Sequence, residues 1–123
     1  MHYTVTVSEP FVAQHALTVP EAGPEGSLHS HRFVASVTFR GPELGEGAYL
    51  LDVDDASAAL AGVVDRYRDE TLNDSLEGNP SCEQLARALH TDVRRALEAP
   101  AVEELTVAIE EDGTAVVGYT GPF

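Results

Sequence analysis

The sequence predicts an α+β fold in which two helices pack on one face of an antiparallel sheet. Apolar and polar residues alternate near both ends of the chain, as they do in strands that bury one face. Between these regions, two segments carry apolar residues at the spacing of a helix. Because the predicted helices follow each other instead of alternating with strands, the order β-β-β-α-α-β-β indicates α+β.

The N-terminal region is predicted to be a strand. Residues 3–7 alternate with β-branched side chains. Pro10 cannot donate a ladder hydrogen bond, so we expect it to force an irregularity in the strand before Phe11. Residues 19–27 contain two prolines and two glycines, and this composition predicts a loop.

The clearest strand covers residues 31–40, in which the odd-numbered side chains are mostly apolar. Gly41 and Pro42 are expected to end this strand. A turn is predicted at residues 45–47, and residues 49–53 are predicted to return as a third strand.

Two helices are predicted next. Asp54 or Asp55 can cap the first helix, whose apolar stripe continues to about Arg68. Ser81 and the glutamine three residues later form a capping box. This box predicts the start of a second helix over residues 82–97.

The C-terminal region is predicted to be a hairpin. Residues 105–111 and 114–119 read as strands, and the Asp112-Gly113 pair between them is a strong signal for a tight turn. No internal repeat or low-complexity segment interrupts the chain. We therefore expect one domain over residues 1–123.

Composition limits the partners that this protein can have. Its 123 residues suffice for one hydrophobic core. The net charge of −14, with only seven Lys and Arg, argues against nucleic acid or an anionic membrane as a partner, because both require a basic surface. No signal peptide or transmembrane run is visible, and a lone cysteine, Cys82, excludes an internal disulfide. These features predict a cytoplasmic location.

Three histidines form the strongest chemical pattern. His29 and His31 share a face on a strand, because side chains two residues apart point the same way. Phe11, Ala13 and His15 share a face by the same rule. If the two strands pair, the three imidazoles converge in the pattern of a catalytic zinc site with an open fourth position. The alternative is that the His-x-His pair is an ordinary surface or hydrogen-bonded pair.

The residues around the histidines resemble a known enzyme family. Phe11-Val-Ala-Gln-His15-Ala-Leu17, followed by His29-Ser-His31-Arg-Phe33, is similar to Phe-x-Ala-x-His-x-Leu and to the His-Gly-His motif with an aromatic residue two positions on. These are motifs of the 6-pyruvoyltetrahydropterin synthase / 6-carboxytetrahydropterin synthase (QueD) family. Further similar motifs follow in the family's order, at residues 49–53, 72–74 and 79–86, and at Glu111 with residues 119–121.

This resemblance implies a tunnelling fold that assembles into homotrimers and homohexamers, with sites between subunits. It implies zinc bound by His15, His29 and His31, and a reaction on the side chain of a dihydroneopterin compound. A base would remove a proton, and triphosphate elimination or carbon–carbon cleavage would follow. Glu111 would bind the pterin ring, with Glu110 as the alternative one residue away.

Two positions depart from the family pattern. The pyruvoyl and carboxy enzymes have a cysteine base shortly before His-x-His, where this chain has Glu25. This resembles a third class of the family, which cleaves the side chain to 6-hydroxymethyldihydropterin. Glu25 is therefore the candidate base, with an ordinary loop acid as the alternative. The family's Asp–His relay pair is replaced by Arg68 and Asp69. Asp69 is then a candidate relay, or both are solvated residues.

Three hypotheses follow. The first is a zinc-dependent pterin lyase in which Glu25 and Asp69 are catalytic. The second is a zinc- and pterin-binding relative without lyase activity, because the Asp–His pair is missing. The third is a structural oligomer whose histidines bind nothing. His90 lies off the apolar stripe of the second helix and is expected at the surface or in a subunit contact.

Overall fold

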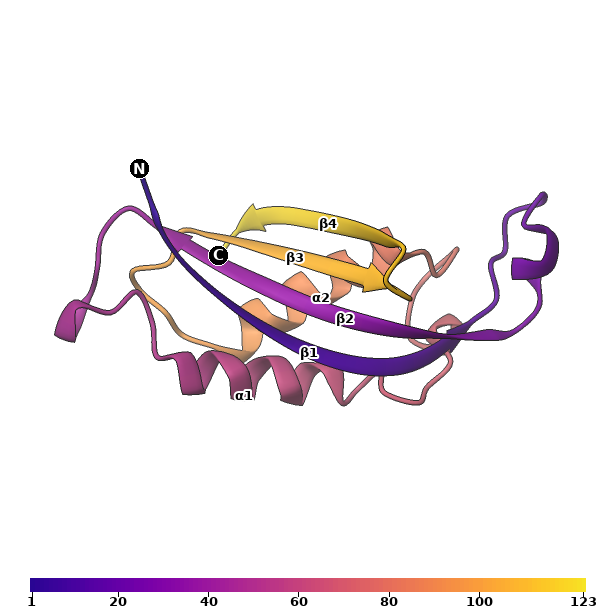
Figure 1. Ribbon diagram of the computed structural model, residues 1–123, viewed down its shortest axis with the longest axis horizontal. Coiled ribbons are helices and arrows are strands. Elements are labelled where there is room, and N and C mark those ends of the chain that lie inside the picture. The colour runs from indigo at the N-terminus through magenta and orange to yellow at the C-terminus, as the bar shows by residue number, and fades with distance from the viewer.

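A computed structural model describes residues 1–123. Four antiparallel strands, in the order β1-β2-β3-β4, form one sheet that lies over two helices (Figure 1). The elements in chain order are β1 (Tyr3–His15), β2 (His29–Gly41), α1 (Val53–Val64), α2 (Cys82–Ala96), β3 (Glu104–Glu111) and β4 (Ala115–Pro122). The predicted α+β class, with both helices on one face of the sheet, is confirmed.

β1 and β2 form a long hairpin that extends past the other two strands (Figure 1). Their pairing is continuous from Tyr3 opposite Gly41 to His15 opposite His29. Pairing of β2 with β3 ends earlier, where Phe33 lies opposite Glu111. The first residues of β2 therefore have only β1 as a strand partner. The projecting end of this hairpin carries three histidines, one on β1 and two on β2.

The core lies between the sheet and the helices. Odd-numbered side chains of β1, β2 and β3 face the helices, and Phe33 and Phe39 at its centre are fully buried. Each helix buries one stripe: Ala56, Leu60, Val63 and Val64 from α1, and Cys82, Leu85, Ala86, Leu89, His90 and Val93 from α2. This agreement between strand parity and helical spacing fixes which face of the sheet is covered.

The irregularity expected at Pro10 is absent, because β1 runs from Tyr3 to His15 with a continuous register on β2. β1 is an edge strand, and its even-numbered residues turn their backbone groups away from β2. Along this outer edge, the carbonyl of Val12 accepts from Asp69 N–H (2.7 Å), and Gln14 N–H donates to Glu70 (3.0 Å). The nitrogen of Pro10 points to the same edge, where no ladder donor is needed.

The predicted third strand over residues 49–53 is also wrong. This segment is a loop that leads into α1 at Val53. Leu50 and Leu51 are both buried although they are adjacent, a pattern that is incompatible with a strand buried on one face. The cap of α1 is Asp52 instead of Asp54 or Asp55, because its carboxylate accepts from the backbone N–H of both following aspartates (2.8 and 3.3 Å).

The other helix and turn signals are largely confirmed. Ser81 caps α2, and its hydroxyl accepts from Gln84 N–H (3.2 Å). The reciprocal bond of a capping box is absent, because Ser81 N–H donates to the Asn79 carbonyl. Asp112 and Gly113 both have positive φ, as the two central residues of a type I′ turn require, and Thr114 N–H closes the turn on the Glu111 carbonyl. α1 ends at Val64, earlier than predicted, and turns continue the chain.

His90 is buried, which contradicts the expected surface or subunit-contact position. Its side chain is 5% exposed, and its ring packs edge-on against Tyr119 with centroids 5.0 Å apart. The apolar stripe of α2 is wide enough to include it. Neither α1 nor α2 has the length and apolar character that a helix needs to cross a membrane.

Replacement by alanine should have opposite effects on stability at two glycines, Gly41 and Gly62. A Cβ at Gly41 would lie 2.2 Å from the carbonyl oxygen of Ala101, whereas a Cβ at Gly62, in α1, would meet nothing within 4 Å. We expect Gly41→Ala to lower the free energy of unfolding by about 2–3 kcal/mol because the backbone must move. Gly62→Ala should raise it by about 0.5–1 kcal/mol. Urea unfolding measures both, and equal effects would contradict this packing.

Tyr67 predicts a loss of stability at alkaline pH. Its hydroxyl donates to Asp92 (2.7 Å), and burial followed by this carboxylate raises its pKa above the ordinary value near 10. The stabilisation is therefore complete below pH 10 and is lost as pH rises above it. Tyr67→Phe should cost about 1–2 kcal/mol at pH 7. The gap between variant and wild type should narrow at pH 11 in urea titrations, and a constant gap would refute the assignment.

Candidate functional site

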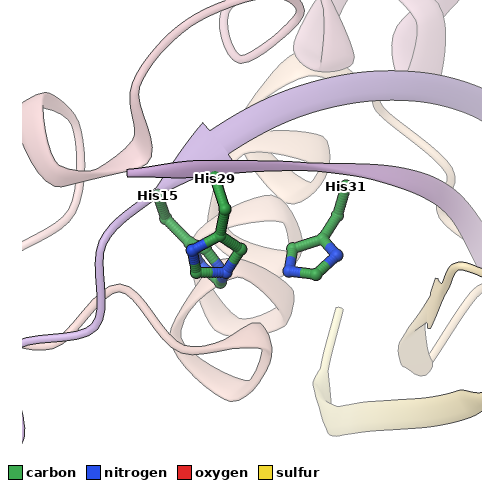
Figure 2. A group of neighbouring side chains, drawn as sticks. All are labelled: His15, His29 and His31. Atoms are coloured by element: carbon green, nitrogen blue, oxygen red, sulfur yellow. The ribbon is translucent and has the colours of Figure 1, made fainter. Parts of the chain in front are cut away.

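Three histidine rings converge at the projecting end of β1 and β2. His15 lies opposite His29, and His31 lies opposite Ala13, so strand parity turns all three side chains to the same side (Figure 2). The ring centroids are 4.6 Å apart for His15–His29, 5.2 Å for His15–His31 and 4.6 Å for His29–His31. One ring nitrogen from each residue lies within 4.8 Å of the others. The expected convergence of the imidazoles is therefore present in the geometry.

Each of the three rings is held through its Nδ1 atom by an oxygen. Nδ1 of His15 is 2.8 Å from the Pro80 carbonyl, and Nδ1 of His29 is 2.7 Å from the Ser27 carbonyl. Nδ1 of His31 bonds to Oδ2 of Asp112. Because these oxygens accept, each Nδ1 donates, which leaves Nε2 as the unprotonated nitrogen of a neutral ring.

The free Nε2 atoms fit a metal ion. Nε2 of His29 and of His31 are both buried and have no hydrogen-bond partner. Burial lowers the pKa of His15, an effect to which the neighbouring histidines add and which the Pro80 hydrogen bond opposes. The ring of His15 is thus favoured in the neutral form that binds a metal ion. Imidazoles fixed at Nδ1 by oxygen acceptors are the usual donor set and outer shell of zinc.

Two carboxylates lie beside His31. Oxygens of Glu25 and Glu111 and a ring nitrogen of His31 all lie within 4.8 Å of one another. Glu25 belongs to a short 3₁₀ turn (Gly23–Gly26), which is tied to the end of β1 because the Glu25 carbonyl accepts from Leu17 N–H (2.8 Å). Its side chain is exposed. The loop between β1 and β2 therefore brings the candidate base close to His31.

Glu111 faces the candidate site, and Glu110 does not share its face. Glu111 pairs with Phe33 on the helix-covered face, whereas Glu110 pairs with Val34. Oε1 of Glu111 lies 3.1 Å from Nε2 of His31, in a direction that makes no hydrogen bond. If this ring nitrogen carries no hydrogen, a cation or a donor between it and the carboxylate would stabilise the contact. Parity thus favours Glu111 over its neighbour.

Cys82 supplies a contact that the sequence did not predict. Its Sγ donates to Oε2 of Glu111 at 3.1 Å. Burial, followed by this carboxylate, raises the pKa of the Cys82 thiol to about 12. The group is therefore a protonated donor at neutral pH, not a nucleophile. The contact arises from the packing of α2 against β3, for which the sequence around Cys82 contains no signal.

Asp69 does not join the histidine group of its own chain. It follows α1 on the outer edge of β1, with φ 61°, and its N–H donates to Val12. A hollow of about 250 Å³ next to it also contains Arg32 and Arg68 but none of the three histidines. Arg68 is engaged there, with Nη2 3.6 Å from Glu9 and Nε 3.1 Å from an oxygen of Asp65.

A larger hollow than the one beside Asp69 lies elsewhere. It measures about 630 Å³ and is formed by the loop after β2 and the segment after α2. No histidine, cysteine or basic residue lines it. Its polar groups are mainly carboxylates, from Glu46, Asp52, Asp54, Asp55 and Glu98. Its size therefore does not make it the candidate site, because the groups suited to catalysis are at the other end of β2.

Comparisons with known proteins identify the relatives of this chain. Its sequence matches the family model described as 6-pyruvoyl tetrahydropterin synthase over residues 4–122. A search of curated proteins found no match.

Solved structures agree in fold. The Caenorhabditis elegans 6-pyruvoyl tetrahydropterin synthase has a TM-score of 0.81 at 19% identity, covering 98% of this chain and 96% of that one. A Plasmodium vivax 6-pyruvoyltetrahydropterin synthase with a catalytic glutamate changed to alanine has a TM-score of 0.85 at 12% identity, covering 100% and 99%. A Burkholderia dihydroneopterin aldolase bound to guanine is more distant, with a TM-score of 0.55, 16% identity, and coverage of 99% and 90%. With its tunnelling fold and its family match over nearly the whole sequence, this chain belongs to the 6-pyruvoyl tetrahydropterin synthase family.

Proposed function

We propose that this protein is a zinc-dependent lyase that acts on the side chain of 7,8-dihydroneopterin or its triphosphate. The observation that carries the proposal is the convergence of three histidines, each fixed through Nδ1, beside two carboxylates. Membership of the family supports a pterin as substrate. The reaction class follows from this combination of metal donors, a base and a group that can hold the pterin ring.

His15, His29 and His31 would hold the zinc ion. When bound there, zinc would make the side-chain hydroxyls of the substrate, and the carbon atoms next to them, more acidic. Three protein ligands leave a coordination position for a substrate oxygen. The Nδ1 contacts of the rings keep them in place, so that little reorganisation would accompany binding.

Glu25 would act as the general base. Its carboxylate lies within 4.8 Å of a ring nitrogen of His31, close to where the substrate side chain would bind. The catalytic residue replaced in the Plasmodium vivax variant is also a glutamate, which supports a carboxylate base in this family. With Glu25 as base, the favoured product is 6-hydroxymethyldihydropterin. The pyruvoyl and carboxy products of other family members are the alternatives.

Glu111 would anchor the pterin ring. A carboxylate accepts two hydrogen bonds from the guanidine-like edge of a pterin. Cys82 donates to Oε2, which orients the carboxylate and leaves Oε1 free to accept. The anchor and the base would thus approach the substrate from two segments that are distant in sequence.

Asp69 remains a candidate proton relay only in an assembly. Because it lies outside the histidine group of its own chain, it would have to serve the site of a neighbouring subunit. We propose a cytoplasmic homotrimer or homohexamer with sites between subunits, as the family resemblance implies. A second candidate function is favoured by the Arg68–Asp69 replacement. In that case the protein binds zinc and a pterin but does not convert it.

A turnover assay tests the proposed activity. Zinc-loaded protein should convert 7,8-dihydroneopterin triphosphate or dihydroneopterin to a 6-hydroxymethyl, carboxy or pyruvoyl product, detected by mass. Glu25→Ala should lower kcat by about 100-fold or more, because removal of a general base typically costs 10²–10⁴. Glu21→Ala, a change at another exposed acid of the same loop, should leave the rate unchanged.

The same assay separates the hypotheses. Binding of either compound without conversion would refute the lyase and establish the non-catalytic relative. Conversion that is unaffected by Glu25→Ala would keep the lyase and reject the assigned base.

Zinc content tests the metal site. The purified protein should carry about one zinc per chain, because three histidines complete one site. His29→Ala and His31→Ala should lose the metal, whereas His2→Ala should keep it, because His2 is an exposed residue outside the cluster. Elemental analysis after gel filtration measures this ratio. Protein that is free of zinc after refolding with excess metal would leave only the structural oligomer.

A further inference from the structure

Asp112 makes a contact that its place in a tight turn does not require. Its N–H donates to the Arg32 carbonyl, and its Oδ1 accepts from Arg32 N–H, both at 2.9 Å. Its other oxygen, Oδ2, accepts from Nδ1 of His31. One side chain therefore bridges the backbone of β2 and an imidazole of the candidate metal site.

The hairpin places Asp112 for this role. The ladder between β2 and β3 ends with Phe33 opposite Glu111, so that Asp112 comes next, opposite Arg32. Asp112 and Gly113 have φ of 49° and 72°. This turn bends the chain back toward β4 while the carboxylate stays against β2. Asparagine and glycine also tolerate such a backbone conformation, so the side chain can be changed without losing the turn.

Asp112 differs in kind from the groups that hold the other two rings. His15 and His29 are held by the backbone carbonyls of Pro80 and Ser27. Only His31 is held by a side chain, and that side chain carries a charge. We propose that Asp112 is the positioning residue that keeps hydrogen on Nδ1 of His31, so that its Nε2 is free to bind the metal.

This inference rests on the proposed metal site. It assigns to Asp112 the role of fixing the tautomer of His31, one of the candidate ligands. A carboxylate next to Nδ1 also makes the opposite nitrogen a stronger donor to a metal ion. Nε2 of His31 is buried and makes no hydrogen bond, although Oε1 of Glu111 lies 3.1 Å away, so Asp112 has to hold the hydrogen on Nδ1 against a second carboxylate on the other side of the ring. Loss of the carboxylate would leave the ring in place on β2 but free to carry its hydrogen on either nitrogen.

The isosteric variant Asp112→Asn tests the tautomer directly. Arg32 N–H needs an acceptor, so the amide oxygen should face it and the NH₂ group should face His31. Nδ1 must then accept, and the hydrogen moves to Nε2. Asp112→Gly removes the carboxylate without supplying a donor, and should leave both tautomers populated. We therefore expect Asp112→Asn to change the His31 tautomer more than Asp112→Gly does.

Two measurements report on this order. In zinc-free protein, ¹⁵N chemical shifts of His31 should indicate hydrogen on Nδ1 in the wild type, on Nε2 in Asp112→Asn and on both in Asp112→Gly. In competition with a chelator, zinc affinity should fall about 10–100-fold in Asp112→Asn and less in Asp112→Gly. Glu83→Gln, which removes an exposed carboxylate near Cys82, controls for net charge and should bind zinc like the wild type.

The outcomes separate this inference from the proposed function. An unchanged His31 tautomer in Asp112→Asn, in protein with a native unfolding transition, would overturn the role of Asp112. Equal loss of affinity in all three variants would also overturn it, because charge alone would then explain the effect. If no variant and no wild type binds zinc, the metal site fails, while the ¹⁵N shifts still decide whether Asp112 selects the tautomer.

Discussion

The register of β1 on β2 is the constraint on which the candidate site depends. Because side chains alternate along a strand, a slip of one residue would turn His15 to the open face, away from His29 and His31. The same slip would remove Phe11 from the core, where its ring packs 5.4 Å from that of Phe33. Burial of these phenylalanines therefore fixes the polar site as well. The apolar core thus sets the strand register that brings the imidazoles together, and the Nδ1 contacts then hold each ring.

The connection between α1 and α2 holds the loop that follows β1. The side chain of Asn73 accepts from Ala16 N–H (2.9 Å) and donates to the Ala16 carbonyl (2.8 Å). The side chain of Asn79 accepts from Thr18 N–H (2.8 Å), and the next residue, Pro80, holds the ring of His15. A connection made of turns and one short 3₁₀ helix (Leu72–Asp74) thus fixes one histidine and the start of the loop that carries the candidate base. These asparagines act on backbone groups, which explains how irregular segments can form a defined site.

Strand parity and helical spacing predicted the layers of the fold and the meeting of the three histidines, because both depend on local periodicity. The errors arose where tertiary contacts replace periodicity. Residues 49–53 form a short apolar run that resembles a strand in the sequence, but Leu50 and Leu51 are buried side by side in a loop. The contact of Cys82 with Glu111 depends on how α2 packs against β3, and the sequence contains no local signal for it. The Asp-Gly pair predicted a turn but not the bond from its carboxylate to a histidine.

The placement of Asp69 bears on how protons would move in the proposed reaction. Asp69 is tied to the outer edge of β1 through its N–H, and Arg68 beside it is already paired with two carboxylates. A single chain therefore gathers the candidate metal donors, the candidate base and the candidate anchor, but not the candidate relay. Glu25 is exposed, so water can carry its proton to and from the bulk. A base that is open to solvent can exchange its proton with water and does not require a buried relay pair. The replacement of the expected Asp–His pair by Arg68 and Asp69 is thus compatible with the proposed catalysis when the base is a glutamate at the loop surface.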